Sequence, residues 1–321
     1  MQLRQLGRTG LEVSRVALGC GNFGGIGSAP AFFGAGESDE EALAIMDAAW
    51  ELGVTLFDTA DAYGGGRSER AVGRWMRERG RRPLVATKVF HSVAGDPRDQ
   101  GLGRERILRQ IEGSLQRLGV ERVDLYLIHQ PDPRTPVAET LGALDELVRA
   151  GTVGAVGASN VDAAQLREAL AVSEERGFVR FEWVQNPYNL LERADEEELL
   201  PLCEEQGLGY TPFGPLAGGW LTGKYRRGEP YPAGSRMTLR PEPYADLEDE
   251  RTYAGLEALA GAARERGVAT AALALAWVLG HPLVTAAVVG PRRPEHLDVA
   301  RAALGIELSG EERRELGALF A

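Results

Sequence analysis

The chain alternates short apolar runs with longer segments in which apolar residues recur every three or four positions. The short runs are apolar on nearly every residue, which is typical of parallel strands buried on both faces. We expect eight strands in these runs, at 16–19, 55–58, 85–88, 125–129, 155–159, 183–186, 209–213 and 287–290. The pattern therefore predicts a parallel sheet covered by helices.

The longer segments have helical periodicity, and several open with an Asp or Ser cap. They cover roughly 39–52, 67–79, 104–118, 136–150, 161–176, 195–206 and 252–280, followed by 294–304 and 310–319. No linker or change of composition interrupts the eight strand–helix units. We therefore predict a (β/α)8 barrel formed by a single α/β domain, residues 1–321.

Two short runs precede the first barrel strand. Residues 3–6 and 11–13 flank Gly7-Arg8-Thr9-Gly10, which favours a tight turn. We expect a β-hairpin that plugs the N-terminal end of the barrel. Three long loops, at 20–37, 89–103 and 217–250, each follow a strand. They are expected to gather over the C-terminal face, where α/β barrels carry their chemistry.

Charge and composition exclude several classes of function. The formal net charge is −11, and no basic stripe or tail offsets it, so nucleic acid and anionic membranes are not expected as partners. The N-terminus lacks the apolar segment of a signal peptide, and no run approaches the ~18 apolar residues of a membrane span. We therefore expect a cytoplasmic protein, of open oligomeric state. Cys20 and Cys203 lack CxxC spacing and are expected to be small core residues.

Five of the predicted strands end in polar or ionisable residues, namely Asp58, Lys88, His129, Ser159-Asn160 and Gln185-Asn186. Lysine is otherwise almost absent, since of 36 Lys and Arg residues only Lys88 and Lys224 are lysines. Lysine is a compact point charge that can tune a neighbouring acid, whereas arginine stays charged in proteins. Lys88 therefore indicates chemistry, although an arginine-rich composition that leaves two lysines over explains the count equally well.

Tyr63 lies five residues beyond Asp58, on the loop that follows the strand. An Asp58–Lys88 pair on neighbouring strands would neutralise itself, and the field of the ammonium would favour loss of a proton from the Tyr63 phenol, whose unperturbed pKa is ~10. His129 would add a second hydrogen bond to the same substrate oxygen. The four side chains suit a carbonyl that becomes an alkoxide as it accepts hydride. The alternative for Tyr63, beside three glycines, is a loop anchor.

This arrangement resembles the Asp, Tyr, Lys, His tetrad of the aldo-keto reductase superfamily. The resemblance runs from Leu3 to about Leu304 and rests on residues 57–64, Ala86-Thr87-Lys88 and 124–129. It implies NADPH-dependent reduction of a small-molecule aldehyde or ketone. In that scheme Tyr63 is the general acid, Lys88 and Asp58 tune it, and His129 orients the carbonyl.

The resemblance also implies contacts to NADP(H). The contact after the first strand is Gly21, Asn22 and Phe23, and Asp58 is also a cofactor contact. Ser159 and Asn160 contact the carboxamide, Gln185 lies under the nicotinamide and Phe213 stacks on it. Those near the phosphates are Pro215, Leu216, Ala217, Gly218, Lys224, Arg236, Gly290, Arg292, Arg293 and His296. Two departures stand out, because Gly214 replaces a common serine and Val299-Ala300 replaces a Glu-Asn pair against the adenine. The second leaves the choice between NADP and NAD open.

Several alternatives compete with these assignments. Gly19 to Gly24 satisfies G-x-G-x-x-G, but the Gly and Pro residues that follow oppose a helix there, so a Rossmann site is not expected. Asp58, Asp61 and His129 could be metal ligands of a barrel hydrolase, although no histidines form an H-x-H pair. No metal site is expected. Arg292-Arg293 could be a solvated pair.

Trp220, in a Gly-rich loop, fits a core position and a ligand contact equally well. The alternative function is a redox-sensing regulatory subunit on the same fold, like the potassium-channel β subunits. An intact tetrad, with His129 unsubstituted, favours the enzyme.

Overall fold

A ring of parallel strands forms the centre of the molecule. The computed structural model describes residues 1–320. Within them the ring contains β3 (Val16–Gly19), β4 (Leu56–Asp58), β5 (Leu84–Val89), β6 (Val123–Ile128), β7 (Val153–Ser159), β8 (Trp183–Gln185), β9 (Gly209–Tyr210) and β10 (Ala287–Val289). The strands follow chain order, with β10 beside β3. A bridge between Phe213 and Val288 closes the ring, which confirms the predicted (β/α)8 barrel.

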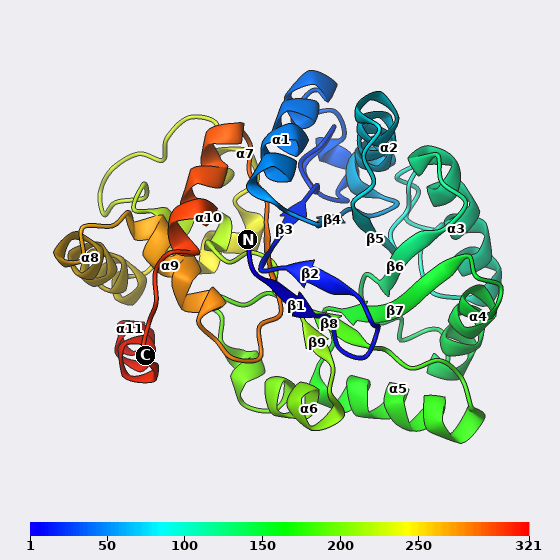
Figure 1. Cartoon of the computed structure of the whole chain (residues 1–321). Coiled ribbons are helices and arrows are strands. Elements are labelled where there is room, and N and C mark those ends of the chain that lie inside the picture. The colour runs from blue at the N-terminus through cyan, green and yellow to red at the C-terminus, as the bar shows by residue number, and fades with distance from the viewer. Residues whose placement is uncertain (321) are drawn as a thin grey trace.

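Helices surround this ring (Figure 1). They are α1 (Asp39–Leu52), α2 (Arg67–Arg79), α3 (Arg104–Leu118), α4 (Val137–Arg149), α5 (Ala163–Arg176), α6 (Leu199–Gln206), α7 (Arg236–Leu239), α8 (Glu250–Glu265), α9 (Thr270–Leu279), α10 (Leu297–Ala303) and α11 (Gly310–Ala318). Capping boxes at Ser38, Asp162 and Ser309 start α1, α5 and α11, since each cap side chain accepts a backbone N–H of the first turn.

Several predicted boundaries are wrong, including the helix predicted from 294, which begins at Leu297. The segment 252–280 forms two helices, because Gly267 adopts a left-handed φ of 66° just after α8. The strand predicted at 209–213 is confined to Gly209–Tyr210, since Pro212 has no N–H to contribute to a ladder. The helix predicted from 195 begins at Leu199, after a short 3-10 turn at Ala194–Glu196.

The predicted hairpin plug is confirmed. Strands β1 (Leu3–Gln5) and β2 (Glu12–Ser14) pair antiparallel, with Leu3 opposite Ser14. Leu6 and Val13 are fully buried in the core inside the barrel, together with Trp183. Figure 1 looks onto this end of the barrel, and the hairpin crosses the ring near its centre.

Side-chain alternation along the strands separates an inner from an outer core. Ala17, Leu56, Ala86 and Leu125 belong to the inner core, whereas a larger cluster fills the space between the strands and the helices. Because alternate residues share a face, Lys88 projects to the same side as Ala86, toward the barrel axis. Both cysteines are buried and free, as expected.

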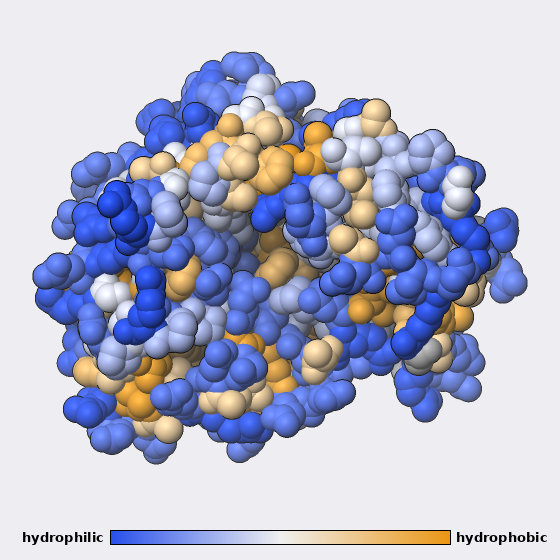
Figure 2. Space-filling model, turned by 180° about the vertical axis from the view of Figure 1, so that it is seen from behind, coloured by the Kyte–Doolittle hydropathy of each residue, from blue (hydrophilic) through white to orange (hydrophobic). Residues whose placement is uncertain are grey.

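The long loops meet at the C-terminal ends of the strands. Arg236 donates to Oδ1 of Asn22 at 3.1 Å, and Arg240 donates to the Ile26 carbonyl at 3.0 Å, so the loops at 217–250 and 20–37 are in contact. Figure 2 shows the face opposite the hairpin, which is hollowed near its centre. Within residues 1–320 no helix combines the length and the apolar character that crossing a bilayer requires.

Candidate active site

Asp58 and Lys88 form a buried ion pair at the C-terminal ends of β4 and β5. Asp58 is paired with Ala86 of β5. Lys88 is the next residue of β5 that points into the barrel. Lys88 Nζ lies 2.7 Å from Asp58 Oδ2 and 2.9 Å from the Thr59 carbonyl oxygen. Lys88 is only 1% exposed. A buried lysine requires such partners, because an uncompensated charge in the protein interior is strongly unfavourable.

The Tyr63 phenol completes this cluster, with its oxygen 3.4 Å from Lys88 Nζ. Tyr63 begins a 3-10 turn, Tyr63–Gly65, in which Gly64 has a φ of 56°. A Cβ on Gly64 would lie 2.6 Å from the Gly24 carbonyl oxygen, so this position requires glycine. Gly21 lies against the phenol ring, since a Cβ there would be 3.6 Å from Tyr63 Cε2. Tyr63 is thus held between the first barrel loop and Lys88.

Burial dominates the acidity of the two proton-carrying groups. Burial raises the pKa of Tyr63, and the Lys88 ammonium offsets only part of that increase. Lys88 acts in the expected direction, but the net shift of the phenol is upward, which corrects the sequence-based expectation. Burial alone would lower the pKa of Lys88, yet the Asp58 carboxylate and Tyr63 outweigh it and raise it. The site therefore holds a protonated phenol beside a charged ammonium.

His129 follows β6 and faces Tyr63 edge-on, with ring centroids 5.4 Å apart. Its backbone N–H donates to the Val89 carbonyl at 2.9 Å, which fixes its position beside β5. Burial, followed by the charge of Lys88, lowers the pKa of His129 well below its usual range, so the imidazole is neutral near pH 7. Its Nδ1 is buried and has no partner within residues 1–320. The four predicted catalytic side chains are therefore brought together.

Ser159, Asn160 and Gln185 link the ends of neighbouring strands. Ser159 Oγ donates to the Gln185 carbonyl at 2.6 Å, and Asn160 Nδ2 donates to the His129 carbonyl at 2.8 Å. Asn160 adopts a left-handed φ of 56°, which is uncommon outside glycine. Gln185 Nε2 donates to Asp58 Oδ1 at 3.0 Å. These side chains support the tetrad in addition to any cofactor contact.

Cationic residues gather at the rim of the barrel. Arg292 is ion-paired to Glu37, whereas Arg293 makes no ion pair within residues 1–320. Burial, followed by the charges of Arg293 and Lys224, lowers the pKa of His296. This donor set suits the phosphates of a dinucleotide. Arg292 is therefore not simply solvated, whereas Arg293 is exposed and still fits a solvated residue.

The other predicted cofactor positions occupy this face in different ways. The Phe23 side chain is fully buried in the outer core, so only its backbone is available at the rim. Phe213 is partly buried and packs against the inner core. The segment Pro215 to Gly218 runs into a turn at Ala217–Thr222, with φ of 46° at Ala217 and 62° at Gly218. Gly290 lies close to the carbonyl of Gly19.

Two alternatives find no support in this arrangement. Asp58 is committed to Lys88 and Gln185, and no group of three or more His, Cys, Asp or Glu residues within 1–320 is placed to hold a metal ion. Gly24 is followed by loop rather than by a helix, which removes the structural context of a Rossmann site. Trp220 is fully buried and packs against Tyr225, Tyr231 and Tyr253, so it is a core residue.

Sequence reasoning missed two residues beside the site. The centroid of the His91 ring lies 4.8 Å from that of the His129 ring, and the two rings meet edge-on. Glu37 lies 2.6 Å from Arg292 although nothing in the local sequence singles it out. Each contact joins residues that are far apart in the sequence, so no short sequence motif could have predicted it.

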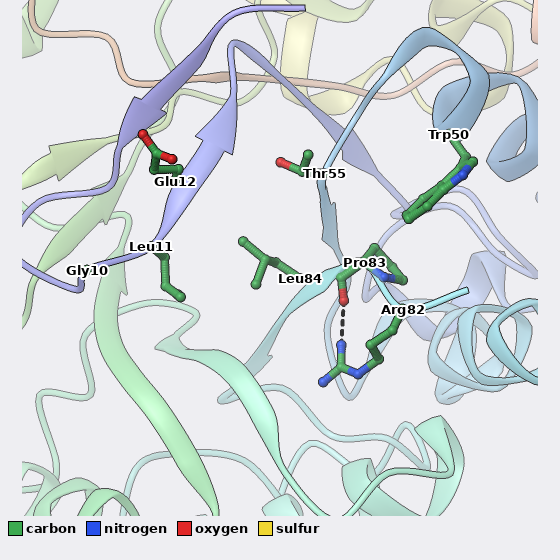
Figure 3. Close-up of a pocket in the computed structure, with 8 residues that line it drawn as sticks. All are labelled: Gly10, Leu11, Glu12, Trp50, Thr55, Arg82, Pro83 and Leu84. Carbon is green, nitrogen blue, oxygen red and sulfur yellow. Dashed lines mark hydrogen bonds between the residues drawn. The ribbon is translucent and has the colours of Figure 1, made fainter. Parts of the chain in front are cut away.

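A cavity at the opposite end of the barrel is separate from this site (Figure 3). Its lining comes from the hairpin, α1 and the starts of β4 and β5: Gly10, Leu11, Glu12, Trp50, Thr55, Arg82, Pro83 and Leu84. Thr55 precedes β4 and Leu84 opens β5, whereas Asp58 and Lys88 lie near the other ends of those strands.

Comparison with known proteins agrees with the fold. The model of the aldo/keto reductase family matches residues 16–320. The chain is 38% identical to the Bacillus subtilis oxidoreductase YrpG, over 100% of this chain and 96% of that protein. It is 37% identical to a probable voltage-gated potassium channel β subunit of Oryza sativa, over 92% and 89% of the two chains. The structure of a glycerol dehydrogenase from Gluconobacter oxydans superposes with a TM-score of 0.83, at 30% identity over 99% of this chain and 95% of the other. The chain therefore belongs to the aldo/keto reductase family.

Proposed function

We propose that this protein is an NADPH-dependent oxidoreductase that reduces the carbonyl group of an aldehyde or ketone and, in reverse, oxidises an alcohol. The observation that carries the proposal is the Tyr63 phenol, 3.4 Å from Lys88 Nζ, which is itself 2.7 Å from Asp58. A protonated phenol can donate its proton to an oxygen that becomes an alkoxide, and the neighbouring positive charge stabilises the phenolate that is left. Tyr63 is therefore assigned as the general acid.

The neighbouring residues have distinct roles in this scheme. Lys88 stabilises the phenolate that Tyr63 becomes, and Asp58 holds Lys88 charged and in place. His129, neutral and next to Tyr63, orients the substrate oxygen by hydrogen bonding. When bound, the nicotinamide would supply the hydride. The hydrogen bond from Gln185 keeps Asp58 directed at Lys88.

The rim supports a phosphate-bearing cofactor. Lys224, Arg236, Arg292 and Arg293 provide positive charge on a protein whose net charge is −11, and His296, whose pKa is lowered, adds a neutral hydrogen-bonding group. Guanidinium groups bind phosphate bidentately, so Arg236, Arg292 and Arg293 are assigned to the 2′-phosphate of NADPH and Lys224 to the pyrophosphate.

A second candidate function follows from the likeness to a potassium channel β subunit. In that case the fold would act as a redox sensor with incidental turnover. Slow turnover together with tight retention of the cofactor would favour the sensor. The complete tetrad supports the enzyme.

A carbonyl screen tests the proposal. Purified protein is mixed with NADPH and a panel of aldehydes, ketones and sugars, and the loss of NADPH absorbance is recorded, with oxidation of glycerol and other alcohols by NADP⁺ as the reverse assay. Turnover of at least one substrate that depends on Tyr63 is expected. Absence of turnover on every compound, with cofactor bound, would instead support the sensor.

A further inference from the structure

Glu37 occupies a rigid position at the rim of the barrel. Its backbone N–H donates to the Asn22 carbonyl at 2.9 Å, and its carbonyl accepts from the Gly24 N–H at 2.9 Å. The preceding Gly36 packs so closely that a Cβ there would lie 1.9 Å from the Asn22 oxygen. The Glu37 side chain is 3% exposed. The carboxylate is therefore held next to Asn22, a residue assigned to the cofactor.

Arg292 reaches this carboxylate from the loop after β10, 255 residues away in the chain. Its Nε donates to Glu37 Oε1 at 2.6 Å, and its Nη1 donates to the Gly234 carbonyl at 2.7 Å. Arg236, from the same loop as Gly234, donates to Asn22. Glu37 thus lies among the guanidinium groups that the proposed function assigns to the 2′-phosphate.

A phosphate and this carboxylate have opposing requirements. A 2′-phosphate bound to Arg292 would either break the ion pair and leave a buried carboxylate unpaired, or lie beside it with like charge. A 2′-hydroxyl is uncharged and can donate a hydrogen bond to the Glu37 carboxylate, so it neither repels this group nor requires the ion pair to break. Glu37 Oε2 is a buried acceptor without a partner within residues 1–320. Carboxylates that accept from a ribose 2′-hydroxyl select NAD over NADP in other dinucleotide sites.

We propose that Glu37 sets the cofactor preference of this protein. Its carboxylate competes with a 2′-phosphate for Arg292 and offers a hydrogen-bond acceptor to a 2′-hydroxyl, so that NADH binds within about tenfold of NADPH, the effect of one hydrogen bond to a charged group. This inference rests on the proposed function, since it presupposes that a dinucleotide binds at this rim.

The test measures dissociation constants of NADPH and NADH by fluorescence titration, without a carbonyl substrate. The proteins are the wild type, Glu37→Gln, Arg292→Ala and the double variant. Glu40→Gln is the control, because it removes the same charge from the exposed first turn of α1. Thermal unfolding of each variant verifies that it is folded.

Glu37→Gln is expected to tighten NADPH binding about tenfold and to leave NADH binding unchanged or weaker. In the Arg292→Ala background the gain for NADPH should disappear, since Glu37 acts through Arg292, and Glu40→Gln should not reproduce it. A ratio of NADPH to NADH affinity that stays within twofold of wild type in Glu37→Gln overturns the inference alone. Failure of the wild type to bind either dinucleotide overturns the proposed cofactor as well.

Discussion

Gln185 donates a hydrogen bond of 3.0 Å to Asp58 Oδ1 across the interior of the barrel. The two residues end β8 and β4, which lie on opposite sides of the ring. The other oxygen of the same carboxylate accepts from Lys88 at 2.7 Å. Asp58 is therefore satisfied on both oxygens, and its orientation toward Lys88 depends on a strand four positions away.

Replacing Gln185 by leucine should leave the fold intact and lower kcat about tenfold or more. The substitution removes one hydrogen bond to a buried charge, worth ~1.5–3 kcal/mol, and frees the carboxylate to turn away from Lys88. Steady-state kinetics and thermal unfolding measure the two effects. Gln110→Leu, at a buried glutamine of α3, is the matched control. Equal kcat in both variants would show that Gln185 does not position Asp58.

Tyr63→Phe should keep cofactor binding and lose the proton donor, with turnover reduced by ~10²-fold or more. Tyr126→Phe is its control, because Tyr126 is also fully buried but its hydroxyl has no partner within residues 1–320. That variant should turn over like wild type. Carbonyl reduction by Tyr63→Phe at a few-fold below wild type would remove Tyr63 from the mechanism.

Lys88→Arg should fold and retain a positive charge beside Asp58, yet lose most of its activity. A guanidinium is larger and planar, with a delocalised charge, so in this buried position it displaces Tyr63 or weakens the field at the phenol. Lys224→Arg, at an exposed rim position, should reduce mainly the affinity for NADPH. Measurements of kcat and of the NADPH dissociation constant separate the two. Wild-type turnover in Lys88→Arg would mean that the scarcity of lysine is only compositional.

The rate of carbonyl reduction should be flat across neutral pH. The raised pKa of Tyr63 keeps the phenol protonated up to and beyond its ordinary pKa of ~10. Loss of the general acid should therefore lower the rate only at alkaline pH. The lowered pKa of His129 keeps the imidazole neutral well below its ordinary ~6.5, so no loss is expected as the pH falls to 6. A profile of kcat/KM between pH 6 and 9 reports these groups in the free enzyme. A rate that falls above pH 7 would contradict the raised pKa of Tyr63, and one that falls below pH 7 would contradict the lowered pKa of His129.

Strand runs that are apolar on both faces predicted a parallel sheet covered by helices, and the eight uninterrupted strand–helix units predicted that this sheet closes into a barrel. In a barrel of parallel strands all C-terminal ends lie at one face, so Asp58, Lys88 and His129 had to share it whatever the side-chain details. The boundaries that failed, at Gly267 and Pro212, depend on local backbone chemistry that periodicity does not register.

The sequence by itself thus determined the barrel, its plug and the face that carries the tetrad, because these follow from chain order and from the apolar strand runs. The tertiary structure alone decided which side chains touch. Gln185 meets Asp58 because β8 lies opposite β4, and Glu37 meets Arg292 because closing the ring brings β10 beside β3. The tertiary structure also decided the direction in which the pKa of Tyr63 is shifted, since desolvation depends on how completely the loops cover the phenol. Here burial outweighs the charge of Lys88.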